Sequence, residues 1–200
     1  PMHKLFPIKL GFNNKKYHPI KKIRKKFFLI IGRHNPHKNL RRVIKAFAYS
    51  KINDYKLIFV GPFDKRHTPS LLKLIDKHNI RHLCVWKGWI DDDEKLSLLN
   101  ECHALIIASL WEGFGIPALE AMACGTPVIA SDRGALREVM GNYGYFINPF
   151  NIQSIACAMN AVINDKKCFE KALQEGPSRA ESFNWLDTAR TIEKIIQEID

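Results

Sequence analysis

The sequence has 200 residues, a hydrophobic fraction of 46% and a formal net charge of +11 at pH 7. This length suits one good-sized domain or two very small ones, and the hydrophobic fraction is ordinary for a chain that buries a core. No apolar run approaches the roughly 18–20 residues of a membrane-spanning helix, and no secretory signal peptide is recognisable. The five cysteines are widely spaced and lack a C-x-x-C pair, which indicates free thiols in a reducing cytoplasm rather than disulfides or zinc ligands.

The positive charge is unevenly distributed along the chain. No Asp or Glu precedes Asp54, while residues 15–26 contain seven Lys or Arg. One interpretation is attraction to an anionic partner, namely a nucleotide, a membrane surface or a nucleic acid. The other is an ordinary solvated surface in a lysine-rich proteome, and the charge pattern alone does not decide between them.

The first 26 residues are polar and basic and contain Pro7, Gly11 and Pro19, which predicts an irregular arm or interdomain linker. Since Pro1 is not a usual start, we expect the sequence to be a domain of a longer protein. Residues 27–200 are assigned to one folded domain. Short apolar runs predict its strands at residues 27–31, 56–61, 83–86, 104–108, 127–130 and 143–147.

Helical patterns alternate with these strands. Apolar residues recur on one face at helical spacing, and the predicted helices cover residues 39–50, 70–78, 91–100, 117–124, 136–140, 152–163 and 185–199. The alternation predicts an α/β fold, a Rossmann-like, doubly wound parallel sheet of about six strands. In such sheets the ligand binds beyond the carboxyl ends of the strands, so we expect the loops that follow the strands to form the site.

The segment GRHNPHKNL, residues 32–40, follows the first predicted strand. Arg33 offers a planar fork for phosphate oxygens, and Lys38 places a point charge at the mouth of the next helix, whose N-terminus is itself partly positive. The pattern predicts an anion site, but it is neither a Walker loop nor a G-x-G-x-x-G fingerprint, and two ordinary surface charges would give the same pattern. His34 and His37 form an H-x-x-H pair, yet nothing nearby supplies the other ligands that zinc needs, so we assign no metal site.

A second candidate lies in WEGFGIPALE, residues 111–120, where two carboxylates flank a glycine-containing loop. The loop glycines allow backbone N–H groups to approach a ligand closely. Glu120 is placed in the first turn of the helix that begins at Pro117, where it either complements the helix dipole or accepts hydrogen bonds from a ribose diol. Glu112 precedes the helix, where capping does not explain it.

Together these motifs resemble a known family. The E-G-F-G-I-P-A-L-E segment, residues 112–120, is similar to the E-x7-E signature of retaining glycosyltransferases of the two-Rossmann GT-B architecture, the glycosyl transferase group 1 family. The G-R and K-N pairs at residues 32–33 and 38–39 match its diphosphate motif. The A-C-G-T-P-V-I-A segment at residues 123–130 and the F-N-W segment at 183–185 match two further motifs. The resemblance extends from about residue 6 to the end.

The resemblance implies a role for each position. Arg33 and Lys38 would hold the donor's diphosphate, Glu120 would bind the ribose hydroxyls, and Glu112 would be the catalytic residue facing the donor sugar. Two loops complete the implied site: the sugar and phosphate loop is Gly113, Phe114, Gly115 and Ile116, and the loop bordering the nucleobase is Lys87, Gly88 and Trp89. Whether Glu112 acts as a nucleophile stays open. So does the alternative that Trp86 and Trp89 are only core or rim aromatics.

The negative charge that develops on the leaving diphosphate would be stabilised by Arg33, Lys38 and loop amides. We therefore expect no cofactor and no metal requirement. The D-x-D at residues 91–93 opens a predicted helix, which favours N-capping over metal binding.

The resemblance further implies that this is the C-terminal, donor-binding domain, and that an absent N-terminal half supplies the acceptor site. We expect the isolated domain to bind donor but to transfer little sugar. The helix at residues 185–199 carries an apolar stripe that we expect to be partly exposed, formed by Ile192, Ile195, Ile196 and Ile199. The motifs favour a mannosyl- or rhamnosyl-type transferase of cell-surface polysaccharide assembly, with GDP-mannose as donor ahead of a UDP- or dTDP-sugar.

Partners and location follow from the same reasoning. We expect a saccharide or lipid-linked acceptor and a cytoplasmic protein, with the basic arm at the anionic inner face of the membrane as a further hypothesis. A non-catalytic nucleotide-sugar-binding or partner domain of the same fold is the main alternative. We expect no nucleic-acid binding, because no recognition motif is present and aromatic residues do not interleave with the basic run.

Overall fold

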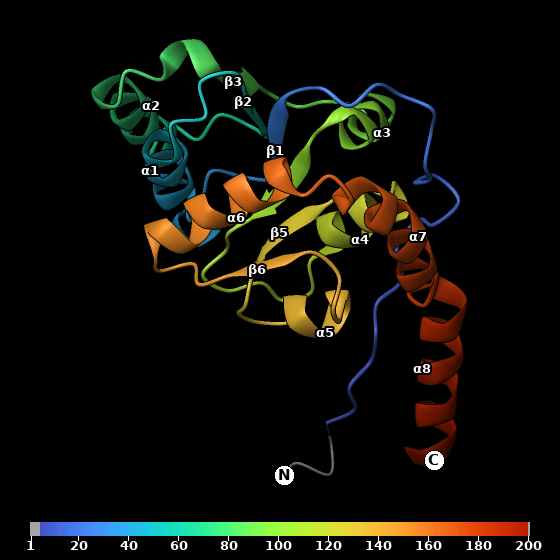
Figure 1. The fold of residues 1–200 in the computed structure, drawn as a ribbon. Helices are drawn as coiled ribbons and strands as arrows, with labels where there is room; N and C mark the ends of the chain where they lie inside the picture. The colour runs from blue at the N-terminus through green and yellow to red at the C-terminus, as the bar shows by residue number, and fades with distance from the viewer. Residues whose placement is uncertain (1–4, 200) are drawn as a thin grey trace.

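The computed structural model describes residues 5–199 and contains one parallel sheet of six strands (Figure 1). The strand order is β3-β2-β1-β4-β5-β6, which confirms the predicted doubly wound, Rossmann-like sheet. Its central strand is apolar on both faces and is paired on both sides, since Leu29 is in register with Ile58 and with Leu105. The strands are β1 (Phe27–Ile31), β2 (Lys56–Val60), β3 (Cys84–Lys87), β4 (Ala104–Ile107), β5 (Val128–Ser131) and β6 (Tyr145–Ile147).

Helices cover both faces of the sheet. In Figure 1, α1, α2 and α6 lie together on one side, while α3, α4 and α7 lie together on the other. The α-helices are α1 (Leu40–Ser50), α2 (Thr68–Lys77), α3 (Asp92–Glu101), α4 (Ile116–Ala123), α5 (Leu136–Met140), α6 (Ile152–Asn164), α7 (Cys168–Glu181) and α8 (Trp185–Ile199), and short 3-10 turns occur at η2 (Pro36–Lys38) and η3 (Arg81–Leu83). All seven predicted helices are present, with small shifts at their ends.

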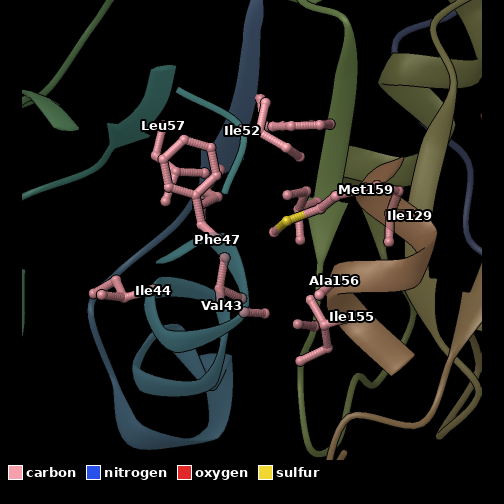
Figure 2. Close-up of a cluster of buried hydrophobic side chains, with 14 of the residues drawn as sticks. Val43, Ile44, Phe47, Ile52, Leu57, Ile129, Ile155, Ala156 and Met159 are labelled. Carbon is pink, nitrogen blue, oxygen red and sulfur yellow. The ribbon is translucent and has the colours of Figure 1, made fainter. Parts of the chain in front are cut away.

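Two cores fill the spaces between the sheet and its helix layers. Figure 2 shows the first, in which Val43 and Phe47 of α1 face Ile155 and Met159 of α6. Each of these side chains is at most 1% exposed. Burial of one such side chain stabilises the fold by about 1.5–3 kcal/mol relative to leaving it in water, so this contact fixes α1 and the loop that precedes it.

The sequence prediction missed α7. Gly176 and Pro177 lie inside this helix, and both residue types normally interrupt helices. Tertiary packing explains the glycine, because a Cβ at position 176 would lie 2.5 Å from the Met122 carbonyl oxygen of α4. The close approach of α7 to α4 thus requires a residue without a side chain.

The arm, here residues 5–26, has no helix or strand, as predicted, but it packs closely against the domain. Phe12 and Tyr17 are buried, and Arg24 donates hydrogen bonds to Leu99 O, Cys102 O, Gly125 O and Thr126 Oγ1 at 2.8–3.1 Å. Four arm lysines form ion pairs: Lys16 with Asp92, Lys22 and Lys25 with Glu101, and Lys26 with Asp54. Half of the eight Lys and Arg side chains in residues 5–26 are therefore paired with carboxylates of the domain.

Helix α8 extends away from the body of the domain (Figure 1). Ile192 is 42% exposed and Ile196 is 56% exposed, while Ile195 is half-buried. These three residues confirm the expected partial exposure, and the side chain of Ile199 lies outside the described residues. Within residues 5–199, no helix combines the length and the apolar character that crossing a bilayer would require.

Candidate functional site

The predicted pair Glu112 and Lys38 meets beyond the carboxyl ends of β1 and β4. One Glu112 oxygen, Oε2, accepts hydrogen bonds from Lys38 Nζ at 2.7 Å and from Ser109 Oγ at 2.9 Å. The two charged side chains are only 21% and 16% exposed. Ser109 was not among the predicted site residues. A partly buried ion pair at this edge holds the carboxylate in one orientation.

Residues 134 and 135 hold the backbone at Glu112 in place. Its carbonyl oxygen accepts a hydrogen bond from Ala135 N at 3.0 Å, and a Cβ at Gly134 would lie 2.3 Å from the same oxygen. Gly115 has a φ of +96°, and a Cβ at this position would lie 2.6 Å from Leu136 Cδ2, so glycine is required for the turn into α4. Gly113 faces open space. This glycine and the exposed Ile116 are the parts of the loop that a ligand can approach.

Asn39 anchors the loop that carries Lys38. From the sequence it was noted only as part of the K-N pair, and no separate role was predicted for it. It is buried, with a left-handed φ of 59°, a conformation that Asn tolerates better than most residues. Its Nδ2 donates to Ala108 O at 3.0 Å and to Pro149 O at 2.7 Å. These bonds tie the start of α1 to the ends of β4 and β6, which brings Lys38 to Glu112.

Arg33 also lies at this edge, directly after β1, and its side chain is exposed. It lines the same narrow pocket as Lys38 and Glu112. Lys38 is already paired in this structure, whereas Arg33 forms no ion pair with any carboxylate among residues 5–199. Arg33 is thus the cation most available to an incoming anion.

Glu120 lies on α4 and is buried, with only 5% of the residue exposed. Its Oε1 accepts a hydrogen bond from Lys95 Nζ at 2.6 Å, and Lys95 Nζ lies 5.2 Å from the centre of the Tyr17 ring. The second oxygen, Oε2, is buried and has no hydrogen-bond partner among the described residues. Because α4 begins at Ile116, Glu120 is its fifth residue, so the prediction that it lies in the first turn was wrong.

Burial raises the pKa of the Glu120 carboxyl, and Lys95 and Tyr17 oppose this effect only in part. The raised pKa means that Glu120 favours the folded state most below its unfolded pKa near 4.5. This contribution is lost as pH rises through the folded pKa. At neutral pH, above the unfolded pKa, the buried Glu120 carboxyl therefore costs stability.

We predict that Glu120→Gln raises the melting temperature at pH 7 and changes it little at pH 4, because a neutral side chain removes the burial cost of the charge. For a chain of this length, each kcal/mol corresponds to about 2–4 °C. Thermal melts of both proteins across this pH range check the prediction. A variant that is destabilised equally at both pH values would contradict it.

The three residues of the predicted nucleobase loop differ in their exposure and in their partners. Lys87 is paired with Glu94, a Cβ added at Gly88 would meet only open space, and Trp89 is 88% exposed. Trp86 instead stacks on Phe59 with ring centroids 4.2 Å apart. Trp86 is thus a packing residue, while Trp89 is a rim aromatic that remains free to contact a ligand.

The remaining predicted features have structural roles. Asp91 caps α3, since its side chain accepts a hydrogen bond from Glu94 N at 2.8 Å, which confirms the N-capping interpretation. His34 is buried with Nδ1 2.7 Å from Thr68 Oγ1, whereas His37 is exposed. Within residues 5–199, no three potential metal ligands gather.

Comparison with known proteins identifies the family. The model of the family described as glycosyl transferases group 1 matches residues 13–179, so the chain belongs to this family, as the C-terminal domain of such an enzyme.

Three similar proteins illustrate the relationship. The chain is 31% identical over 206 residues to an alpha-1,3/1,6-mannosyltransferase ALG2 of Dictyostelium discoideum, covering 93% of this chain and 49% of that protein. The structure of a C-terminal domain of a group 1 family protein (LpcC) from Francisella tularensis has a TM-score of 0.75 and 26% identity, covering 86% of this chain and 97% of that one. The structure of Anabaena Alr3699/HepE in complex with UDP and glucose has a TM-score of 0.84 and 21% identity, covering 94% of this chain and 55% of that one.

Several of the matching curated relatives are mannosyltransferases. The chain spans between about a fifth and a half of the length of these relatives. The similarity therefore identifies a sugar-transferring enzyme family with a Rossmann-like GT-B domain.

Proposed function

We propose that this chain is the donor-binding domain of a retaining glycosyltransferase that takes a hexose, with mannose first, from a nucleoside diphosphate sugar. The observation that carries the proposal is the Lys38–Glu112 ion pair of 2.7 Å, with exposed Arg33 beside it in the same pocket. A carboxylate and two cations converge at the edge of the sheet where ligands bind in this fold. The mannosyltransferase relatives support mannose as the sugar, and GDP-mannose is the proposed donor ahead of UDP- and dTDP-sugars.

The pairing suggests how the site changes when the donor binds. The incoming diphosphate competes with Glu112 for Lys38, and Arg33 adds a second cation, so that charge on the leaving group is stabilised by protein groups rather than by a required metal. Ser109 keeps Glu112 in place when Lys38 turns to the phosphate. The Glu112 carboxylate is then directed toward the sugar, where it stabilises positive charge at the anomeric carbon.

Glu120 is proposed to bind the ribose hydroxyls. Its Oε2 has no partner among the described residues, which is the condition expected of an acceptor that a ligand hydroxyl satisfies. Because this oxygen is enclosed, Lys95 or Tyr17 must shift slightly to admit the ribose. Trp89 would form the rim of the nucleobase site.

A titration of the domain with GDP, UDP, dTDP and their sugar conjugates tests the proposal, with EDTA and separately with magnesium. We expect one nucleotide to bind without metal and Arg33→Ala to weaken binding about tenfold or more, because it removes a charge-assisted contact. Lys21→Ala is the matched control, since it removes an exposed arm cation. If Lys21→Ala and Arg33→Ala have the same effect, the proposed phosphate site is wrong.

The acceptor is proposed to be a saccharide or lipid-linked saccharide in cell-surface polysaccharide synthesis, bound by an N-terminal half. The isolated domain is therefore expected to bind donor without transferring sugar, in a cytoplasmic enzyme that works at the inner face of the membrane. The alternative, a non-catalytic domain of the same fold, is favoured less because Arg33, Lys38, Glu112 and Glu120 are all present. Full activity of a complete protein carrying Glu112→Gln would support that alternative.

A further inference from the structure

A second concave surface lies outside the donor site, between α1 and α2. This groove has a volume of about 830 Å³. Arg41, Lys45 and Tyr49 follow one another at four-residue spacing along α1, so they share one face. Lys73 and Lys77 lie opposite them on α2.

The cations of this groove are not matched by carboxylates. No Asp or Glu lines the groove, and none of its four Lys and Arg residues takes part in an ion pair formed within residues 5–199. Asp76, the only acid on α2, pairs with Arg81. The arm differs, because five of the eight Lys and Arg residues in residues 5–26 are held by partners in the domain. The groove therefore brings together four cations that have no carboxylate partner among the described residues.

The other lining residues indicate what kind of anion fits. Ala48, Leu74 and Ile152 supply apolar surface, and Tyr49 is 61% exposed. Ser70 adds a hydroxyl to the groove, where its Oγ accepts a hydrogen bond from Arg41 Nη1 at 3.4 Å. Apolar and aromatic surface combined with a few polar groups is typical of sites for organic ligands rather than for bare ions. Sugar rings offer both an apolar face and hydroxyls to such a surface.

We propose that the α1–α2 groove binds an anionic saccharide chain, one that carries carboxylate or phosphate groups. The proposal rests on the proposed function, because a sugar-transferring enzyme supplies the reason for a saccharide ligand. Arg41 lies three residues after Lys38, so the groove leads away from the edge where the donor is proposed to bind. A chain in the groove would thus be held close to the enzyme that acts on it.

Calorimetric titration with an oligogalacturonate at low salt tests this, with a neutral malto-oligosaccharide of the same length as the uncharged probe. We expect the anionic probe to bind and the neutral one to bind at least about tenfold more weakly. The double variant Lys73→Gln/Lys77→Gln should weaken oligogalacturonate binding by about tenfold. The matched control Lys15→Gln/Lys21→Gln, which removes two exposed arm cations, should leave it unchanged.

Tyr49→Ala separates a saccharide site from a simple charged patch. It should weaken oligogalacturonate binding several-fold but leave inorganic polyphosphate binding unchanged. An equal effect on both probes, or an equal loss in the arm control, would overturn the proposal. So would binding of phosphatidylglycerol vesicles through Lys73 and Lys77 without oligogalacturonate binding, because the ligand would then be a membrane. Nucleotide titrations of the same variants should be unchanged, which keeps this test separate from that of the donor site.

Discussion

Glu112→Gln is expected to lower sugar transfer by the complete enzyme about 10²–10³-fold, while nucleoside diphosphate binding to this domain stays unchanged or becomes tighter. In the structure the carboxylate holds Lys38 Nζ at 2.7 Å, so a diphosphate must compete for that cation. Glutamine removes the competing charge and keeps the side-chain shape. The loss of transfer follows because glutamine cannot stabilise positive charge at the anomeric carbon.

The opposite directions of the two effects make this prediction specific. Transfer rates of the complete enzyme and calorimetric titration of the domain measure them separately. Asp54→Asn is a suitable control, because it also removes a carboxylate from an ion pair, the exposed one with Lys26. Asp54 precedes β2 and so lies at the opposite edge of the sheet from the site. If nucleotide binding and transfer fall together in Glu112→Gln, Glu112 maintains the structure of the site rather than taking part in transfer.

The sheet could be predicted from the sequence because its strands are short, continuous apolar runs. The helix at residues 168–181 could not, because Gly176 and Pro177 argue against a helix locally. The reason for the glycine is the carbonyl of Met122 on another helix, and such long-range packing overrides local propensity. Prediction failed where a distant contact determined the structure.

Long-range contacts also limited what could be predicted about the site. The residues at the edge of the sheet could be located because strand ends mark that edge, but the ion pair between Lys38 and Glu112 joins positions 74 residues apart. Lys95, which holds Glu120, carried no signal in the sequence beyond its charge. The basic run at residues 15–26 was equally ambiguous, because the carboxylates that neutralise much of it, such as Glu101, belong to a later helix.

The partly buried side chain of Arg24 anchors the arm, and Arg24→Met is expected to destabilise the domain by about 3 kcal/mol. Arg24 donates to Leu99 O, Cys102 O, Gly125 O and Thr126 Oγ1, and burial lowers the pKa of its guanidinium. Methionine preserves much of the apolar stem but takes the guanidinium donor from Cys102 O and Gly125 O, while Leu99 O keeps the hydrogen bond from Thr126 Oγ1. At about 2–4 °C per kcal/mol, the melting temperature should fall by roughly 6–12 °C.

Lys25→Met provides the control for Arg24→Met, because it removes a neighbouring cation that forms an exposed ion pair with Glu101. Exposed pairs contribute only about 0–1 kcal/mol, so this variant should melt close to the parent protein. Arg24→Lys should recover little stability, since an ammonium group cannot reproduce the planar fork of the guanidinium. Equal melting temperatures for Arg24→Met and Lys25→Met would mean that Arg24 does not anchor the arm. A large difference between them would show that the basic segment is part of the folded domain and that one of its cations serves the core rather than a partner.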